Sequence, residues 1–475
     1  MGKLPEGVNE ESRREHRLTQ TNSRSTHFQR VMHNLWLDNR VGALIHPEPR
    51  ALATGGDKGG WLCFCKLNWW QKTMQEFEEY QPRIARSMRP KCEDFQSEGR
   101  LKHLILAAQL TPELLEKLRR MSDMIRRLAR TREGNRRLKE LLSHKRAMLY
   151  FTQPSTRTFL SFMAACQILG ITCNEVRDPK TSSEVKRESR TDSIRMFSSY
   201  FDVIIMRSVI SDFAESCAYL MNNLERQDMR SVPIINAGAG SDEHPTQALL
   251  DMYTILRTFD FDQTADKQSS FVELQKTYSE LTRGPANKTY LFCGDIGRGR
   301  TVRSLTTVLS QYENVRVVFV SPEHETLRLG DDLRRRLHQA GVAVYEFHSL
   351  DAELDGKPLL QQVDCFYMTR IQLEYGSSDE KGEIESMDLS PFHLTKQRVD
   401  LLKPYVPIMH PFPRDSVIQE IPPEIDSDPR VMYFRQARNG MWARAALLIH
   451  MFGACLLYTS PSPRDATLSR MPSSA

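Results

Sequence analysis

Three hydroxyl side chains and one guanidinium stand together at the start of an apolar segment. Residues 151–162 read FTQPSTRTFLSF, with Ser155, Thr156, Arg157 and Thr158 in succession. Hydroxyl donors, a cation and the free amides of a helix N-terminus together favour the binding of an anion. The alternative is a plain helix N-cap, which needs one Ser or Thr and gives the arginine no role.

Two side chains that suit a polar ligand follow in residues 236–251, NAGAGSDEHPTQALLD. His244 and Gln247 are three residues apart there, so on a helix they face the same side. A lone histidine is more often structural than catalytic, and that alternative stays open here. GDIGRGRTVRSL at 294–305 is a further strand–turn–helix pattern, but its spacing departs from G-x-G-x-x-G and indicates a dinucleotide only weakly.

Regular elements must position these residues, and the sequence indicates an alternation of strands and helices. Short apolar runs predict buried strands over Ala147–Phe151, Phe201–Met206, Val232–Asn236, Lys288–Cys293, Val315–Val320, Ala343–Phe347, Val363–Met368 and Val406–Met409. Apolar residues at helical spacing predict helices over Phe159–Leu169, Thr246–Thr258, Arg303–Ser310 and His324–Ala340. An earlier helix begins after Thr111, where proline takes the first helical position.

This alternation predicts an α/β fold of two doubly wound parallel-sheet domains with the active site in the cleft between them. Ligands of such sheets bind at the carboxyl ends of the strands. Each polar stretch follows a predicted strand, including TRIQLE after Met368 and HPFPR after Met409. A single cleft would therefore collect all of them.

Composition and charge exclude several classes of protein. The 475 residues are 40% hydrophobic and 26% charged, as in ordinary globular proteins, and a net charge of +5 is too small to indicate a nucleic-acid partner. The longest apolar run, Ala445–Tyr458, has about fourteen residues and is too short to span a bilayer. Nine scattered cysteines without zinc-ligand spacing indicate free thiols, so we expect a cytoplasmic protein, with an organelle matrix as the alternative.

Taken together, the polar stretches resemble the catalytic subunit of the aspartate carbamoyltransferases. FxxxSTRT, HPTQ, GDxxxGRT, YMTRxQxE, HPxPR and YFRQARNGMWAR occur in that family's order and at its approximate spacing, over about residues 100–454. STRT alone would indicate only the carbamoyltransferase superfamily. HPTQ and HPFPR favour the aspartate branch, because the ornithine branch resembles HPCQ and HCLP and has an SMG loop that this sequence lacks.

The resemblance implies a role for each matching position of a donor site. The residues that would bind carbamoyl phosphate are Ser155, Thr156, Arg157, Thr158, Arg207, His244, Gln247, Phe412 and Pro413. The catalytic residues among them would be Arg157, Thr158, Arg207 and His244, the last three near the carbonyl oxygen whose negative charge grows during attack. Gln247 would bind the carbamoyl NH₂ with backbone carbonyls near Phe412 and Pro413, and the peptide between these two would be cis.

The resemblance also implies an acceptor site and an assembly. Arg300, Arg370 and Gln372 would bind aspartate, since a guanidinium meets a carboxylate with two parallel hydrogen bonds. Ser182 and Lys186 match residues that relatives insert into a neighbouring subunit's site, which implies a homotrimer. Arg187 replaces the glycine usual after this lysine, which favours a more restricted loop backbone. No metal or other cofactor is expected, and neither nucleic acid nor a membrane is expected as a partner.

The sequence divides into four consecutive parts: an extension of unknown role (1–96), a carbamoyl-phosphate-binding domain (97–245), an aspartate-binding domain (246–436) and an end segment (455–475). The intervening residues 437–454 are expected to return to the first domain as a helix and complete it. Tyr433–Gly453 is expected to form a strand, a turn at Asn439-Gly440 and then that helix. The end segment begins CLLYTSPSPRD, resembles translated sequencing-adaptor DNA and is expected to be an artefact.

The expected function is transfer of the carbamoyl group of carbamoyl phosphate to L-aspartate, giving N-carbamoyl-L-aspartate and phosphate in pyrimidine biosynthesis. Two alternatives remain open. One is a carbamoyltransferase for another amino acid such as ornithine, and the other is a non-catalytic paralogue that assembles with active subunits. Loss of Arg157, His244 or Arg300 would favour the paralogue, and all three are present.

Overall fold

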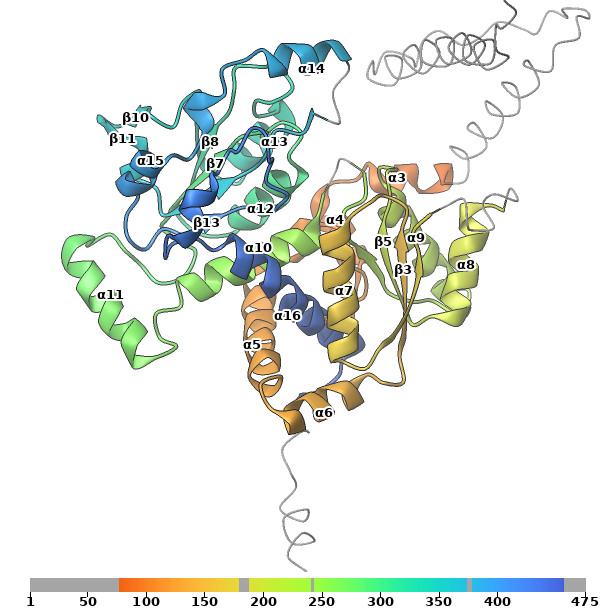
Figure 1. The fold of residues 1–475 in the computed structure, drawn as a ribbon. Coiled ribbons are helices and arrows are strands. Elements are labelled where there is room, and N and C mark those ends of the chain that lie inside the picture. Colours follow the sequence, from red (N-terminus) through yellow and green to blue (C-terminus); the bar gives the residue numbers. More distant parts are fainter. Residues whose placement is uncertain (1–76, 179–187, 241–242, 374–377, 457–475) are drawn as a thin grey trace, which may run out of the picture. The chain divides into compact units, whose positions relative to one another are not determined.

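Two parallel β-sheets form the framework of the protein in the computed structural model (Figure 1). The residues that the structure describes are 77–178, 188–240, 243–373 and 378–456. All of them belong to one compact unit of the chain. Residues 1–76 of the predicted extension and residues 457–475 of the predicted artefact lie outside the described residues.

The first sheet has four strands in the order β4-β3-β5-β6, and all neighbours are parallel. Its strands are β3 (Arg146–Phe151), β4 (Thr172–Val176), β5 (Val203–Arg207) and β6 (Ile234–Asn236). The predictions of β3, β5 and β6 are confirmed. The sequence does not predict β4, because this edge strand is largely exposed and therefore carries no apolar run.

The second sheet has five parallel strands in the order β13-β12-β7-β8-β9. Its strands are β7 (Thr289–Cys293), β8 (Arg316–Val320), β9 (Ala343–Phe347), β12 (Cys365–Met368) and β13 (Ile408–Met409). All five are predicted and confirmed, with ends that shift by at most two residues. In each sheet the first parallel strand, β3 or β7, has neighbours on both sides, which creates a point where the strand order reverses.

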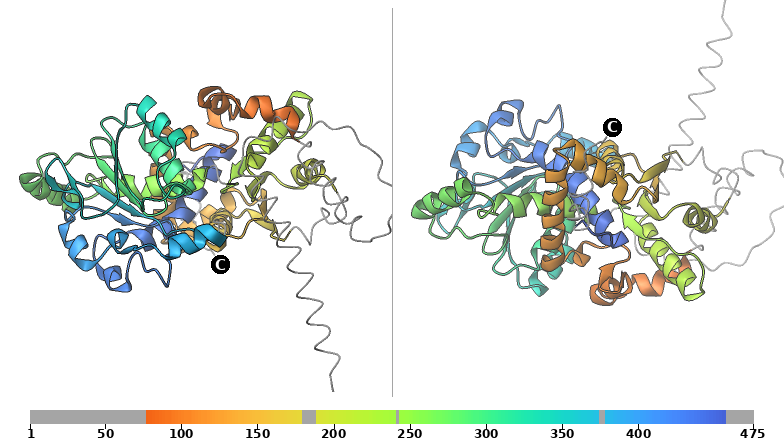
Figure 2. Two further views of the ribbon diagram at one scale, coloured as in Figure 1. Left: turned by 90° about the horizontal axis from the view of Figure 1, so that it is seen from above. Right: turned by 90° about the horizontal axis from the view of Figure 1, so that it is seen from below.

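Helices alternate with these strands and pack around both sheets (Figures 1 and 2). Those that precede β7 are α3 (Gln81–Ile84), α4 (Met88–Asp94), α5 (Pro112–Leu128), α6 (Arg132–Leu141), α7 (Thr156–Ile168), α8 (Arg190–Tyr200), α9 (Phe213–Arg226), α10 (Pro245–Thr258) and α11 (Ala265–Thr277). Those that follow are α12 (Arg300–Leu309), α13 (Asp331–Gln339), α14 (Ser378–Glu385), α15 (Lys396–Leu401) and α16 (Tyr433–Phe452). Two small antiparallel hairpins complete the list: β1 (Gln96–Ser97) with β2 (Arg100–Leu101), and β10 (Glu353–Leu354) with β11 (Lys357–Pro358).

Two helices, α10 and α16, hold the core together. Every residue of α10 from Pro245 to Leu256 is buried, so this helix is covered on all sides. The C-terminal helix α16 packs along α5, α7 and α10 (Figure 1). Side chains that α10 and α16 direct toward the strand ends are therefore held rigidly.

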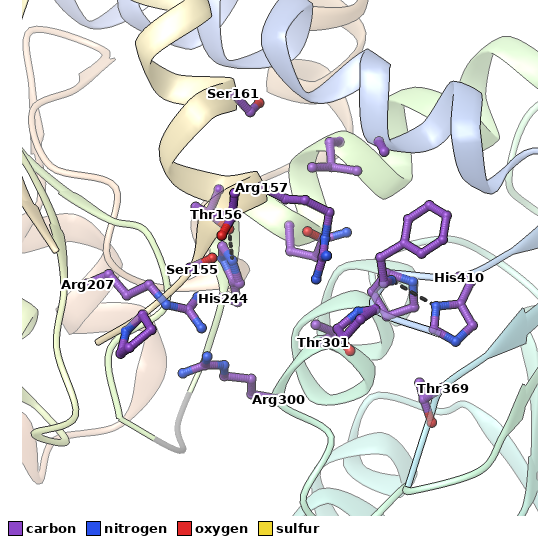
Figure 3. Close-up of a pocket in the computed structure, with 18 of the residues that line it drawn as sticks. Ser155, Thr156, Arg157, Ser161, Arg207, His244, Arg300, Thr301, Thr369 and His410 are labelled. Carbon is purple, nitrogen blue, oxygen red and sulfur yellow. Dashed lines mark hydrogen bonds between the residues drawn. The ribbon is translucent and has the colours of Figure 1, made fainter. Parts of the chain in front are cut away.

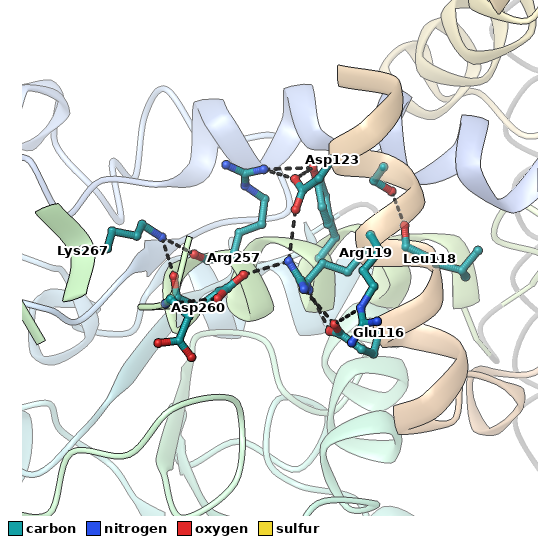
Figure 4. Close-up of polar contacts among 11 residues, drawn as sticks. Glu116, Leu118, Arg119, Asp123, Arg257, Asp260 and Lys267 are labelled. Carbon is teal, nitrogen blue, oxygen red and sulfur yellow. Dashed lines mark hydrogen bonds and ion pairs between the residues drawn. The ribbon is translucent and has the colours of Figure 1, made fainter. Parts of the chain in front are cut away.

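Ion pairs fix α5 against the end of α10 (Figure 4). Arg119 of α5 pairs with Glu116 and Asp123 on its own helix and with Asp260, which follows α10, at 2.8 Å. Asp123 also accepts a hydrogen bond from Tyr253 of α10 at 2.8 Å. Because these groups are partly buried, they are less screened by solvent than surface pairs and they fix the register of the two helices.

The prediction for Tyr433–Gly453 is wrong in its first half. α16 is one continuous helix through this segment, without a strand and without a turn at Asn439-Gly440. Gly440 lies where α16 crosses other helices: an added Cβ would be 2.7 Å from Nη1 of Arg444 and 3.0 Å from Oγ of Ser161 on α7. The glycine that resembles a turn signal thus provides space for close packing of helices.

We expect Gly440→Ala to lower the free energy of unfolding by about 1–3 kcal/mol, because the new methyl group overpacks a buried contact. Helix propensity alone predicts the opposite sign, since alanine is favoured over glycine by about 1 kcal/mol. Chemical denaturation of the full chain measures the difference. Gly382→Ala in α14 is the matched control, because a Cβ there meets nothing within 4 Å. Equal stabilisation by both substitutions would contradict the prediction.

The predicted helix over His324–Ala340 is also wrong in its first part, since α13 begins at Asp331. The carbonyl of Leu327 accepts hydrogen bonds from the amides of Ile296 and Gly297, at 3.0 and 2.9 Å. Residues 324–330 therefore support the turn after β7 with their backbone, and this use of the carbonyl replaces a helical hydrogen bond.

Candidate active site

One cavity of about 780 Å³ collects the polar stretches that the sequence analysis singles out (Figure 3). Of the predicted site residues, those that line it are Ser155, Thr156, Arg157, Thr158, Arg207, His244, Gln247, Arg300, Arg370, Gln372, Phe412 and Pro413. Ser182 and Lys186 lie outside the described residues. The predicted residues that the cavity brings together are up to 258 positions apart in the sequence, from Ser155 to Pro413.

The topology of the sheets explains this convergence. Ser155 to Thr158 follow β3, and Arg207 ends β5, the neighbour of β3. Arg300 follows β7, and Arg370 follows β12, the neighbour of β7. Since neighbouring parallel strands end at the same edge, the groups from each sheet gather at the point where its strand order reverses.

The STRT segment forms the N-terminal turn of α7. The helix begins at Thr156, three residues earlier than predicted, with Ser155 at the N-cap position and no capping hydrogen bond from its side chain. The first backbone hydrogen bond of this turn joins the Phe159 amide to the Ser155 carbonyl at 3.3 Å. The amides of Thr156 to Thr158 therefore precede the hydrogen-bonded helix and point toward its N-terminal end, where an anion is favoured. Figure 3 shows Ser155 and Thr156 at the start of this helix, near Arg207 and His244.

Cationic side chains dominate the lining of the cavity. The arginines that line it are Arg157, Arg207, Arg300, Arg370 and Arg444. Among the described lining residues there is no aspartate or glutamate. Partial burial, together with the charge of Arg370, lowers the pKa of Arg157, which shows that the guanidinium groups repel one another in this arrangement. A cavity with this charge favours ligands that carry several negative charges.

A glycine makes room for Arg207 and His244. Nη1 of Arg207 donates to the carbonyl of Ala237 at 3.2 Å, next to Gly238, whose φ is +101°. A Cβ on Gly238 would lie 2.6 Å from that Nη1 and 3.1 Å from Cδ2 of His244. Only glycine combines this backbone angle with this approach of two functional side chains.

His244 is a buried histidine at the start of α10. Its backbone amide donates to Oγ of Ser304 on α12 at 2.8 Å, while Nε2 lies 3.5 Å from Oγ1 of Thr158 and Nδ1 lies 3.4 Å from Oγ1 of Thr246. Burial, and then the charges of Arg207, Arg300 and Arg444, lower the pKa of His244 well below its usual 6.5. The imidazole is therefore neutral near pH 7 and can act as a hydrogen-bond donor without carrying a charge.

We expect the His244 ring to show no protonation in NMR spectra of the folded chain as the pH falls from about 8 to about 6, because its native pKa is well below 6.5. The unfolded chain takes up this proton near pH 6.5, so His244 lowers the stability of the native state as the pH falls below that value. A His244→Gln variant assigns the resonance. A ring that titrates between pH 6 and 7 would contradict the assignment of a neutral imidazole.

Arg300, the first residue of α12, reaches across to the loop after β6. Its Nη1 donates to the carbonyl of Gly240 at 2.5 Å, to that of Gly238 at 3.3 Å and to Oε1 of Gln153 at 3.3 Å. These acceptors are neutral oxygens. A carboxylate that enters the cavity would form stronger, charge-assisted hydrogen bonds with the same guanidinium.

The loops after β12 and β13 close the opposite side of the cavity. The amide of Gln372 donates to Oδ2 of the buried Asp295 at 3.1 Å, which anchors the segment that carries Arg370. The Phe412–Pro413 peptide is cis, as predicted. The Phe412 amide donates to Nδ1 of His410 at 2.8 Å, and the guanidinium of Arg157 lies 5.7 Å from the centre of the Phe412 ring.

Several polar residues at or behind the cavity are not among the predicted site residues, and three of them stand out by their contacts. Gln436 and Arg444 line it from α16, and Asp251 lies behind Gln247 on α10. Gln436 and Arg444 are eight residues apart in the motif YFRQARNGMWAR, which is close to two helical turns, so a helical reading of this motif would have placed both on one face. The incorrect strand and turn assignment concealed that signal.

The comparisons with known proteins agree with this site. Residues 102–257 match the family described as aspartate/ornithine carbamoyltransferase, carbamoyl-P binding domain, and residues 286–451 match its Asp/Orn binding domain. The aspartate carbamoyltransferase catalytic subunit of Vibrio campbellii is 33% identical over 348 residues, which cover 73% of this chain and 95% of that protein. The chloroplastic aspartate carbamoyltransferase of Oryza sativa is 34% identical over 340 residues, 71% of this chain and 80% of that protein.

A solved structure supports the same relationship. Aspartate transcarbamoylase from Trypanosoma cruzi, in complex with carbamoyl phosphate and aspartate, superimposes with a TM-score of 0.59 at 30% identity and covers 73% of this chain and 95% of that one. Sequence similarity over both sheets, the shared fold and the order of the motifs all support membership of the same family. The chain belongs to the aspartate carbamoyltransferase family.

Proposed function

We propose that this protein transfers the carbamoyl group of carbamoyl phosphate to the α-amine of L-aspartate, giving N-carbamoyl-L-aspartate and phosphate for pyrimidine biosynthesis. The observation that carries the proposal is the single arginine-rich cavity, where the N-terminus of α7 meets Arg300 and Arg370 from the second sheet. A phosphate dianion and the two carboxylates of aspartate match this charge. The structure of the Trypanosoma cruzi relative is a complex with carbamoyl phosphate and aspartate.

The phosphate of the donor would bind at the start of α7. The amides and hydroxyls of Ser155 to Thr158 offer hydrogen bonds there, and the guanidinium groups of Arg157 and Arg207 offer charge. We assign this donor site to a domain of residues 97–245, completed by residues 437–454, and the acceptor site to residues 246–436.

The carbonyl oxygen of the donor would lie near Thr158, Arg207 and His244. Negative charge grows on this oxygen as the amine attacks, and donors that are already in place stabilise it without reorganisation. Two of these three side chains, Arg207 and His244, occupy the space that a side chain on Gly238 would need, and Oγ1 of Thr158 lies 3.5 Å from Nε2 of His244. Gln247, together with backbone carbonyls near Phe412 and Pro413, would bind the carbamoyl NH₂.

Arg300 and Arg370 would bind the carboxylates of aspartate, with Gln372 in support. The amine then forms a bond to the carbamoyl carbon, the bond from that carbon to the phosphate oxygen breaks, and the departing phosphate takes the amine proton. Holding the two substrates in contact supplies about 7–11 kcal/mol of barrier reduction in favourable cases, so no covalent intermediate is required.

We also propose that the protein is a homotrimer in which Ser182 and Lys186 complete the site of a neighbouring subunit. Apolar side chains at the mouth of the cavity support this: Leu160 and Val209 both line it and are 56% and 66% exposed in the single chain. Such exposed apolar surface is typical of an interface. Light scattering on the full chain is expected to give three times the mass of one chain.

For location we propose the cytoplasm, with an organelle matrix as the alternative that the chloroplastic relatives from rice and Arabidopsis illustrate. The cysteines within the described residues are all free thiols, which suits a reducing compartment. Over the same residues, no helix has both the length and the apolar character needed to cross a membrane.

The test supplies labelled carbamoyl phosphate to the purified full chain and compares aspartate with ornithine as acceptors. We expect carbamoyl transfer to aspartate, reduced at least about a hundredfold in His244→Ala because a donor to the oxyanion is lost. Transfer to ornithine instead would overturn the choice of acceptor and keep the donor site. Binding of carbamoyl phosphate without transfer to either amino acid would favour a non-catalytic paralogue.

A further inference from the structure

A carboxylate buried behind the cavity binds the side chain that faces the donor. Asp251 lies one helical turn after Gln247 on α10, is fully buried and does not line the cavity. It accepts three hydrogen bonds: Oδ1 from Nε2 of Gln247 at 3.0 Å and from Nε2 of Gln436 at 2.6 Å, and Oδ2 from the hydroxyl of Tyr367 at 2.8 Å. The three donors belong to α10, α16 and β12.

These contacts fix which way each amide points. An ionised carboxylate only accepts hydrogen bonds, so Gln247 and Gln436 must both turn their NH₂ groups toward Asp251. The orientation of Gln436 has independent support, because its Oε1 accepts the backbone amide of His410 at 2.9 Å. In Gln247 the amide is planar and its nitrogen is directed away from the cavity, so the carbonyl oxygen is the atom presented to the cavity that the residue lines.

We propose that Asp251 is a positioning residue that locks Gln247 as a hydrogen-bond acceptor and so makes the donor site selective for an NH₂ group over a methyl group. The inference rests on the proposed function, in which Gln247 faces the carbamoyl NH₂. A glutamine that could rotate its amide would meet the ligand NH₂ with its own NH₂ for part of the time, so the advantage of NH₂ over CH₃ would become smaller. The acceptor held by Asp251 pairs with NH₂ and is left unsatisfied by CH₃.

The protonation state of Asp251 provides a second test of the proposal, through the pH dependence of ligand preference. Burial raises its pKa to about 7, while the hydrogen bonds from Gln436, Tyr367 and Gln247 and the charge of Arg444 oppose this. The titratable or charged groups that face it are Tyr367 and Cys365 from β12 and Arg444 from α16. A protonated Asp251 carries a donor, which no longer excludes the rotated amide of Gln247.

The experiment compares the binding of carbamoyl phosphate with that of acetyl phosphate, in which a methyl group replaces the NH₂. Calorimetry on the full chain without aspartate gives the ratio of the two dissociation constants. Both ligands carry the same phosphate and carbonyl groups. General damage to the phosphate site therefore changes both dissociation constants alike and leaves their ratio unchanged. We expect the wild-type protein to bind carbamoyl phosphate at least about tenfold more tightly than acetyl phosphate. The reason is that NH₂ donates a hydrogen bond to the Gln247 oxygen, whereas CH₃ leaves that buried oxygen without a partner.

Two substitutions at Asp251 separate positioning from stability. Asp251→Ala removes the acceptor, and we expect the preference to fall below about threefold, since the Gln247 amide can then rotate. Asp251→Asn carries a donor as well as an acceptor, as a protonated Asp251 does, so it is expected to give an intermediate preference. The control is Asp364→Ala: Asp364 is a buried carboxylate that accepts from the Thr289 amide, Lys403 and Tyr405, so its loss lowers stability and leaves the preference unchanged.

The outcomes are distinct from those that test the proposed function. An unchanged preference in Asp251→Ala overturns the inference, whether or not carbamoyl transfer to aspartate occurs. If Asp251→Ala does not fold, the wild-type protein decides the question. Its preference is expected to fall as the pH decreases through about 7, and to remain constant in Asp251→Asn. A wild-type preference that stays constant between about pH 8 and about pH 6 overturns the inference.

Discussion

Arg157→Leu is expected to lower kcat/KM for carbamoyl phosphate about a thousandfold, because it removes a guanidinium from the site that we propose for the phosphate dianion. Arg157 stands in the first turn of α7, next to three hydroxyl side chains and the free amides of the helix N-terminus. Partial burial and the charge of Arg370 lower its pKa, so without a ligand the guanidinium is destabilised and an anion relieves that repulsion. Steady-state kinetics with aspartate at saturation measure the effect.

Two further arginine variants separate charge from geometry. Arg157→Lys keeps the charge and loses the planar fork, so we expect an intermediate loss of about 10–100-fold. Arg120→Leu on α5 removes a side chain that is 74% exposed and remote from the cavity, and activity should persist. If Arg157→Leu retained more than about a tenth of the wild-type kcat/KM, the assignment of the phosphate to the start of α7 would be wrong.

Gly238→Ala is the second large effect, with an expected loss of at least about a hundredfold in kcat from one methyl group. The new Cβ would lie 2.6 Å from Nη1 of Arg207 and 3.1 Å from Cδ2 of His244, so it displaces two of the three groups that we propose face the donor carbonyl oxygen. Displacing such donors by about 1 Å is enough to lose this much rate. The measurement is kcat, together with a circular dichroism spectrum to establish that the variant is folded.

A matched glycine isolates crowding from backbone strain. Gly341 follows α13 with φ at +75°, and a Cβ there meets nothing within 4 Å. Gly341→Ala is therefore expected to lower the free energy of unfolding by about 1–2 kcal/mol, because alanine disfavours the left-handed backbone conformation. The substitution does not affect the cavity, so kcat is expected to remain that of wild type. Equal losses of activity in the two variants would show that strain, and not the approach to Arg207 and His244, explains the effect.

Some elements escape sequence reasoning for identifiable physical reasons. β4 is an edge strand whose side chains are largely exposed, so its sequence has no apolar run from which a strand could be predicted. Leu329, Leu333 and Leu337 are buried at helical spacing, yet the segment before Asp331 is a turn because the carbonyl of Leu327 binds the amides of the loop after β7. Asn439-Gly440 resembles a turn and is helical, because α16 approaches its neighbours closely at the glycine.

The sequence by itself determined the strands of both sheets apart from β4, and the polar stretches that follow them. Buried parallel strands must be continuously apolar, and ligands of such folds bind at strand ends, so both signals are local. Only the tertiary structure decided which distant side chains support those stretches. Asp251, Gln436 and Tyr367 meet because a fully buried helix, the C-terminal helix and a strand of the second sheet pack together. No local pattern encodes that meeting, since Tyr367 and Gln436 lie 116 and 185 positions from Asp251 in the sequence.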